Sequence, residues 1–312
     1  MTVLEAGSHP GQQHGAAVGA LVSVVVPVFN DFERLALCLR ALAQQSWPRA
    51  ALEVLVVDNG SAGDIRPVLA PFEFARLLEE PRPGSYAARN RALREARGEV
   101  LAFTDVDCIP DPEWLEQGVA ALRRAGPGAV VGGRVEVFPH DAARATWAEE
   151  FELALGFSQQ LYVEQRHYCA TANMFTSAEV FVRVGPFNDV LKSGGDQEWG
   201  RRAFAAGVRF AYAEGALVRH PARRTLGELL RKRARLVGGH LSMARAQHPE
   251  WLAFSKVFLK ACLPPVVRVA RAHRRGKGGW RRDARVFAVG TLLQAWSVRE
   301  LMRLRLGGAP KR

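Results

Sequence analysis

The feature that most constrains the fold of this chain is a series of short, almost continuously apolar segments in its first third. They read LVSVVVPV at residues 21–28, LEVLVVD at 52–58 and EVLAFT at 99–104. Runs this rich in β-branched residues are typical of strands buried on both faces of a parallel sheet. Helical patterns separate them. We therefore expect a Rossmann-like α/β fold, with a mostly parallel sheet, flanking helices and a binding site at the carboxyl ends of the strands.

Local start signals place further elements. Asp111, Pro112 and Glu113 offer an N-cap, a proline at the first helical position and a favourable charge, so a helix is expected to begin there. Thr225 and Glu228 have the spacing of a capping box, which begins another helix. Helices are also expected at 31–45, 85–97, 177–184 and 196–206, and strands at 129–138 and 208–213.

The composition excludes several classes of protein. Apolar residues make up 48% of the 312 residues, which rules out a chain that is disordered throughout. The longest apolar runs, 16–29 and 286–298, have 14 and 13 residues, fewer than the ~20 that span a bilayer. No two cysteines form a C-x-x-C pair, which argues against a disulfide framework and for a reducing compartment such as the cytoplasm. The four cysteines are Cys38, Cys108, Cys169 and Cys262.

Charge is distributed unevenly along the chain, whose net charge is +12. Residues 1–218 hold 20 basic and 27 acidic side chains, a net charge of −7, whereas residues 219–312 hold 23 basic and four acidic ones, a net charge of +19. We expect a flexible leader at 1–18, a catalytic domain at 19–220 and a basic helical extension at 221–312.

Acidic side chains follow the apolar segments, at the edge of the sheet where ligands bind. Asp58 ends the second segment, and Asp105 and Asp107 follow the third in the sequence FTDVDC. Two carboxylates spaced two residues apart at a strand end can turn toward one hard cation, such as Mg²⁺ or Mn²⁺. The alternative is that these acids only end strands and begin turns.

Further motifs occur in a fixed order with these acids. They are VVVPVFN at 24–30, VVDNGS at 56–61, GSYAARNRAL at 84–93, FTDVDC at 103–108, GPFNDVLKSGGDQEWGRRAFAAG at 185–207 and ALVRH at 216–220. This series closely resembles the family 2 glycosyltransferases, over about residues 21–240. The resemblance implies a GT-A fold and a metal-dependent enzyme that transfers a sugar from a nucleotide-sugar donor with inversion.

The resemblance also implies which residues bind the donor. The acid that ends the second strand would contact the nucleobase, and the carboxylate of Asp58 can accept the imide N–H of uracil. The A-R-N segment would lie beneath the nucleotide sugar, where an arginine fork suits a phosphate or a carboxylate. From the residues alone, Arg89 could equally be a charge on a helix surface. The expected nucleotide-binding residues are Pro27, Val28, Asn30, Asp58, Arg89, Asn90 and Asp105.

The metal site follows from the same resemblance. Asp105 and Asp107 match the D-x-D pair that holds Mn²⁺ or Mg²⁺ on the diphosphate, and His220 in VRH matches a third contact. Positive charge there would stabilise the leaving nucleoside diphosphate. A lone histidine can also be purely structural, and that alternative stays open.

The acceptor side is implied by the segment SGGDQEW. Asp196 matches the general base that deprotonates the acceptor hydroxyl, and Glu198 is the rival for that role. This segment departs from the family because Gly195 stands where Glu is usual. Asp196 could also be no more than a helix N-cap. Asn173 and Trp199 are the expected acceptor contacts, although the alternative for both is a place in the core.

The basic extension has two interpretations. Val286, Val289, Leu293 and Trp296 recur at helical spacing among arginines, which suits the interface of an anionic membrane. The same face could pack on the catalytic domain or on a second subunit. We favour the membrane, which would place the protein peripherally on its inner face. The basic residues that motivate this are Arg231, Lys232, Arg233 and Arg235 and, around Trp280, Arg268, Arg271, Arg274, Arg275, Lys277, Arg281, Arg282 and Arg285.

The expected function, implied by the resemblance, is transfer of a sugar from a UDP-sugar to a hydroxyl of a carbohydrate or lipid-linked acceptor in polysaccharide or glycolipid synthesis.

 No other series of motifs in the chain indicates a different class of enzyme. A sugar-phosphate nucleotidyltransferase is disfavoured because the loop after the first strand, VFNDFERL, lacks glycine. A nucleic-acid-binding module is disfavoured, and no nucleic acid is expected as a partner, because the extension has few aromatic residues and the rest of the chain is acidic. A relative that binds without catalysis stays open because of Gly195.

Overall fold

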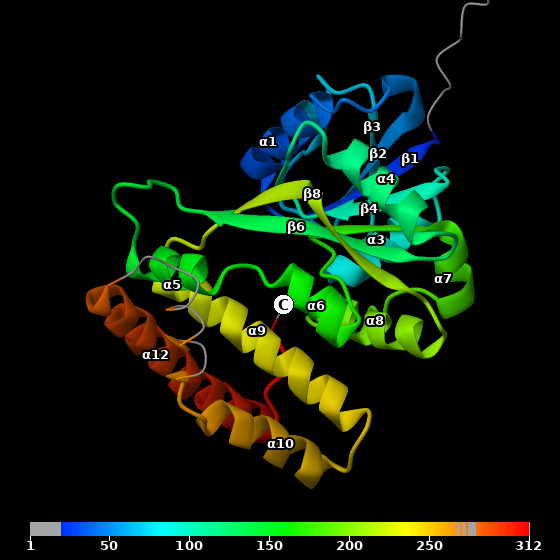
Figure 1. The fold of residues 1–312 in the computed structure, drawn as a ribbon. Helices are drawn as coiled ribbons and strands as arrows, with labels where there is room; N and C mark the ends of the chain where they lie inside the picture. Colours follow the sequence, from blue (N-terminus) through cyan, green and yellow to red (C-terminus); the bar gives the residue numbers. More distant parts are fainter. Residues whose placement is uncertain (1–19, 267–268, 271–272, 274–278, 312) are drawn as a thin grey trace, which may run out of the picture.

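The computed structural model describes residues 20–266, 269–270, 273 and 279–311. Within these residues the chain forms one eight-stranded sheet that is covered by helices (Figure 1), and the order of its strands is β3-β2-β1-β4-β7-β6-β8-β5. The strands are β1 (Val22–Val28), β2 (Leu52–Asp58), β3 (Ala75–Glu79), β4 (Val100–Thr104), β5 (Ile109–Pro110), β6 (Val130–Phe138), β7 (Asn173–Ser177) and β8 (Phe210–Pro221).

The expected α/β fold is confirmed, and the sheet is a mixed one in which parallel pairs outnumber antiparallel pairs among the described strands. Strands β3, β2, β1 and β4 run parallel to one another, as do β6 and β8. Strand β7 lies antiparallel between β4 and β6, and β5 pairs antiparallel with β8. A buried strand has the same apolar pattern in either direction, so the sequence did not reveal the reversal at β7.

The strands of the first half are buried on both faces because their apolar residues are continuous. Val24 and Val26 of β1 face one apolar cluster, whereas Val25 faces the other. This alternation follows from the two-residue period of a strand. Helices supply the other side of each cluster, for example Leu35 of α1 on one face and Ala88 of α3 on the other.

The helices lie close to where local signals place them. They are α1 (Phe32–Ala43), α2 (Arg66–Leu69), α3 (Ser85–Leu93), α4 (Trp114–Ala125), α5 (Trp147–Leu155), α6 (Gln159–Arg166), α7 (Ala178–Val184), α8 (Gly195–Ala205), α9 (Leu226–Arg245), α10 (Glu250–Cys262) and α12 (Trp280–Arg305). The capping box of Thr225 and Glu228 is present at the start of α9. Helix α4 begins later than predicted because Asp111 accepts a backbone hydrogen bond from Trp114 and closes a turn first.

Helices α9, α10 and α12 gather on the side of the molecule opposite β1–β3 (Figure 1). The apolar face of α12 does not stay open: Val286, Val289 and Leu293 pack with Phe151 of α5 and Leu229 of α9. The alternative of packing on the rest of the chain therefore holds for these three side chains, which are not available to a membrane. No helix in the described part of the chain is long and apolar enough to span a bilayer.

Acidic residues of α5 form ion pairs with basic residues of the extension. Glu152 contacts Arg223 at 3.1 Å and Lys232 at 2.7 Å, and Glu150 contacts Arg285 at 2.7 Å. The predicted leader at 1–18 and the basic residues Arg268, Arg271, Arg274, Arg275 and Lys277 lie outside the described residues.

Candidate active site

The loops that follow β1 and β2 are tied together beside Asp58. Val28 and Asp58 are partners in register on neighbouring strands, and the Asp58 carboxylate accepts the backbone N–H of Ser61 at 3.2 Å. Asn30 has a positive φ of 53°, and its Oδ1 accepts the backbone N–H of Ala62 at 2.7 Å. Pro27 and Val28 are buried beneath this edge. The predicted nucleobase side of the site is thus one connected edge of the sheet.

Arg89 points inward from α3. Its side chain is 3% exposed, and its guanidinium donates to Oδ1 of Asp105 in an ion pair. Its Nε is buried without a hydrogen-bond partner among the described residues. Arg89 is therefore no helix-surface charge, and it joins the A-R-N segment to the D-x-D segment as a buried cation.

Asn90 has a different place from its neighbour. Its Nδ2 donates to the carbonyl of Phe187 at 2.8 Å, and its Oδ1 accepts the Phe187 N–H at 3.0 Å. Both hydrogen-bonding groups of the amide thus hold the loop that leads toward α8. Asn90 therefore positions that loop, and its contact with a nucleotide sugar stays a prediction.

Asp107 and His220 face each other at the other side of the D-x-D turn. His220 Nε2 lies 3.5 Å from Oδ2 of Asp107, and Nδ1 lies 2.8 Å from the carbonyl of Pro221. A carbonyl only accepts, so Nδ1 carries a proton, and in the neutral ring Nε2 presents a lone pair near the carboxylate. Oxygen and imidazole donors with this arrangement suit a divalent cation.

The expected three-residue metal set is only partly assembled. No group of three or more His, Cys, Asp or Glu side chains in the described ranges is placed to hold a metal. Asp107 and His220 are brought together, whereas Asp105 is turned to Arg89. Mg²⁺ and Mn²⁺ use few protein ligands when substrate phosphates complete their coordination, so the pair fits such an ion.

Asp196 lies in the first turn of α8, half-buried. Its Oδ1 accepts the backbone N–H of Gln197 at 2.9 Å and the hydroxyl of Tyr86 at 3.2 Å. Burial raises the pKa of Asp196 above its ordinary value, and the two hydrogen bonds and the charge of Arg89 oppose that rise without cancelling it. A carboxylate with a raised pKa is the stronger base.

Tyr86 also explains why glycine stands at 195. A Cβ atom added to Gly195 would lie 2.7 Å from Cε2 and 2.9 Å from Cζ of the Tyr86 ring. The Tyr86 side chain is 6% exposed and fills the space next to the backbone of residue 195. The departure from the family pattern is thus coupled to Tyr86, a residue that sequence reasoning missed. Its signal was present in GSYAARN, where Tyr86 lies one turn before Arg89.

The remaining predicted acceptor residues lie away from solvent or are paired. Asn173 is fully buried, accepts the indole N–H of Trp114 at 2.9 Å and donates to two backbone carbonyls. Trp199 is 1% exposed and stacks on Phe181 at 4.7 Å. Neither offers a surface to a sugar, which corrects the expectation of acceptor contacts. Glu198 is held by Arg202 at 2.7 Å, so Asp196 is the better placed base.

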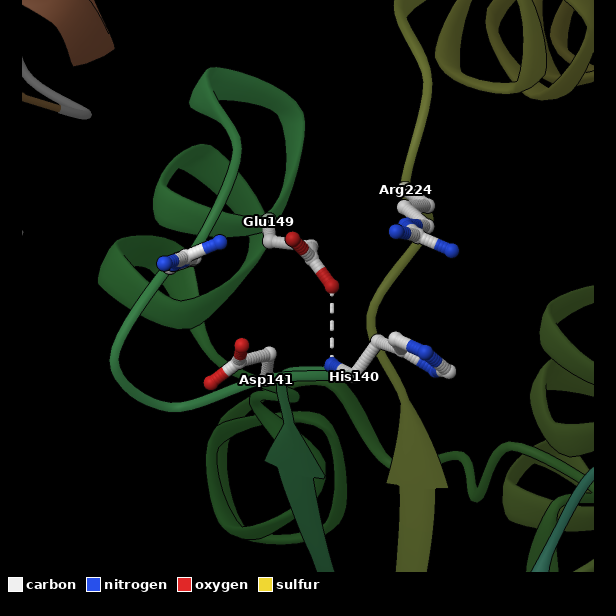
Figure 2. A pocket seen from close by; sticks show the side chains of 5 residues that line it. His140, Asp141, Glu149 and Arg224 are labelled. Atoms are coloured by element: carbon white, nitrogen blue, oxygen red, sulfur yellow. Dashed lines mark hydrogen bonds between the residues drawn. The ribbon is translucent and has the colours of Figure 1, made fainter.

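A cavity beside the start of α5 lies outside this group. Figure 2 shows its lining, with Glu149 accepting the backbone N–H of His140 at 2.8 Å. The cavity measures about 420 Å³. Glu149 also forms the capping box of α5 with Thr146, so its buried carboxylate is accounted for by the loop that it holds. The lining residues are His140, Asp141, Arg144, Glu149 and Arg224.

Comparison with solved structures defines the class of fold. A mannosyltransferase from Pyrobaculum calidifontis, solved in complex with GDP-Man and Mn²⁺, superposes with a TM-score of 0.61 at 20% identity, over 93% of this chain and 90% of that one. Residues 1–349 of TarS from S. aureus superpose with a TM-score of 0.53 at 17% identity, over 92% of each chain. The fold is that of the GT-A glycosyltransferases.

Comparison of sequences then gives the family. The model of glycosyl transferase family 2 matches residues 23–185, and glycosyltransferase AglE of Haloferax volcanii is 38% identical over 71% of this chain and 73% of its own length. The chain therefore belongs to glycosyl transferase family 2. A pre-mycofactocin glycosyltransferase of Mycobacterium tuberculosis is 27% identical over 73% of this chain, which spans about half (48%) of that relative.

Proposed function

We propose that this glycosyltransferase moves a sugar from a UDP-sugar to a hydroxyl of a carbohydrate or lipid-linked acceptor, with inversion at the anomeric carbon. The observation that carries the proposal is one line of contacts through the site. Asp196 accepts the hydroxyl of Tyr86, the guanidinium of Arg89 lies 5.6 Å from the Tyr86 ring, and Arg89 pairs with Asp105. A basic carboxylate thus stands beside a buried cation.

The two ends of this line suit the two halves of a displacement. Oδ1 of Asp196 accepts both hydrogen bonds, so Oδ2 has no hydrogen bond from the described residues and can take the acceptor proton. Arg89, which pairs with Asp105, would add positive charge near a departing diphosphate as that group gains negative charge. A base for the acceptor together with charge stabilisation for the leaving group supports a single in-line displacement, which would invert the anomeric carbon.

The Asp107–His220 pair supports use of Mn²⁺ or Mg²⁺. A divalent ion, when bound, would supply further positive charge to the leaving diphosphate. Asp107 and His220 are the residues that would hold it, and the lone pair of His220 toward Asp107 fits that role. The mannosyltransferase with the similar fold was solved with Mn²⁺, which supports a divalent ion here by analogy of fold.

Donor choice is tested by thermal shift with UDP-, GDP- and dTDP-sugars, each with and without Mn²⁺. Ligands that bind the folded state raise Tm, so the donor that stabilises the protein reports the nucleobase directly. We expect the largest shift with a UDP-sugar and Mn²⁺, followed by transfer to an acceptor with inverted configuration by NMR. The proposal fails if no nucleotide sugar raises Tm and Asp107→Ala leaves nucleotide binding unchanged.

A further inference from the structure

Helix α10 has apolar side chains on its outer face as well as on its inner one. Phe254 and Ala261 pack into a cluster with Leu241 of α9 and Leu301 of α12. On the outer side of the helix Trp251 is 70% and Leu259 65% exposed, and just past its end Leu263 is 63% and Val266 55% exposed. Packing of α10 on α9 and α12 needs only one apolar stripe, so the outer residues are left without an explanation in the fold.

The outer residues share one side of the helix, with Ser255 between Trp251 and Leu259. Trp251, Ser255 and Leu259 recur at intervals of four, and Leu263 continues the series just beyond the last turn. Residues four apart lie on one side of a helix, one above the other. Lys256 and Lys260 are exposed beside them, and Nζ of Lys256 lies 2.9 Å from His248 Nε2.

The charge of this region favours an anionic partner for the exposed apolar residues of α10. Residues 219–312 carry a net charge of +19. Two copies of so basic a surface would repel each other on approach, which disfavours a dimer through this face. An exposed tryptophan with leucines and flanking lysines matches the interface of an anionic bilayer, where the ring and the leucines enter the headgroup region and the lysines meet phosphates.

We propose that the outer face of α10 lies in the surface of an anionic lipid bilayer. The stripe that the sequence suggested for this role, on α12, packs inside the protein, and α10 provides a stripe that is exposed. Lipid binding does not depend on the transfer reaction. Only its use in reaching a lipid-linked acceptor rests on the proposed function, so failure of one does not imply failure of the other.

The native cysteines allow a direct test on the full chain. Cys262 is exposed at the end of α10, whereas Cys38, Cys108 and Cys169 are buried. The emission of an environment-sensitive fluorophore on Cys262 should shift to shorter wavelength when vesicles of phosphatidylglycerol and phosphatidylcholine are added. Vesicles of phosphatidylcholine alone should cause no such shift. The protein should sediment with the anionic vesicles, less so as salt rises. Equal binding to both kinds of vesicle, or to neither, overturns the proposal.

Substitutions then locate the contact. Leu259→Glu with Leu263→Glu should weaken sedimentation with anionic vesicles by about tenfold or more, because two carboxylates enter the interface. Val182→Glu with Val190→Glu is the matched control, since these residues are 87% and 79% exposed outside α10 and the charge change is the same. Lys256→Glu with Lys260→Glu tests the electrostatic part separately. Unchanged vesicle binding in both α10 variants contradicts the proposal. So does a protein that is dimeric without vesicles and becomes monomeric in these variants, because the face would then be a dimer interface.

Discussion

The hydroxyl of Tyr86 donates a hydrogen bond of 3.2 Å to Oδ1 of Asp196, across 110 positions of sequence. The same ring occupies the space that a side chain at residue 195 would need. Tyr86 thus reaches the base from another helix and fills the space beside the backbone of residue 195. Its hydrogen bond lowers the pKa of Asp196, while burial raises it.

Tyr86→Phe should move the acid limb of the kcat–pH profile to higher pH. The base acts ionised, so activity rises with pH through the pKa of Asp196, and loss of the Tyr86 donor raises that pKa further. Other groups that act on Asp196 are Arg89, Asp105, Tyr168 and Cys169. Tyr212→Phe, which loses a hydrogen bond to Glu214, is the control. An unshifted profile in Tyr86→Phe means that the hydroxyl does not tune the base.

Gly195→Ala should destabilise the protein by about 1–3 kcal/mol, because the new Cβ overlaps the Tyr86 ring. Replacing Tyr86 by alanine in the same chain removes the overlap, so the double variant should lose less stability than the two single losses added together. Urea unfolding of the four proteins gives the coupling free energy. Additive losses would show that the two residues do not share the space.

Asp107→Asn and His220→Ala should each weaken Mn²⁺ binding in the presence of a nucleoside diphosphate, by about tenfold or more. Asp105→Asn should have the smaller effect on the metal, because Asp105 is paired with Arg89. Calorimetric titration of Mn²⁺ measures this order. His273→Ala removes a histidine that contacts Asp283 at 2.7 Å and serves as the control. If His220→Ala left the affinity for Mn²⁺ unchanged and Asp105→Asn abolished Mn²⁺ binding, Asp105 rather than His220 would be the metal ligand.

Gly239→Ala should destabilise the protein by about 1–3 kcal/mol and lower kcat. A Cβ at this position of α9 would lie 2.2 Å from the backbone oxygen of Ser193, in the loop that precedes Asp196. Gly227→Ala is the control in the same helix, since its Cβ would meet nothing closer than 3.6 Å and alanine favours helix. Equal stability of the two variants would show that α9 does not support that loop.

Glu152→Gln should destabilise the protein by about 1–3 kcal/mol, since it leaves Lys232, whose side chain is 32% exposed, without its anionic partner. Burial raises the pKa of Glu152, but Lys232 and Arg223 outweigh it and lower the pKa from 4.5 to about 2. A lowered pKa stabilises the folded state above 4.5, and that stability is lost as pH falls from 4.5 toward 2. Urea unfolding at several pH values should show a flatter acid slope in the variant than in the wild type.

Local sequence patterns predicted most of the elements that build the site. β2 ends at Asp58 as expected, and α8 begins beside Asp196. Such patterns depend on residues a few positions apart, which is why periodicity and capping signals reveal them. The motif order was specific enough to identify the family before any contact was known.

The sequence by itself determined the buried strands, the acids at their ends and the family of the chain. Only the tertiary structure decided that Arg89 points inward, that Tyr86 fills the space beside Gly195, and that Asn173 and Trp199 belong to the core. It also decided that Val286, Val289 and Leu293 of α12 pack inside the protein, whereas Trp251 and Leu259 of α10 stay exposed. These outcomes depend on contacts between residues far apart in sequence, and local propensity carries no information about them.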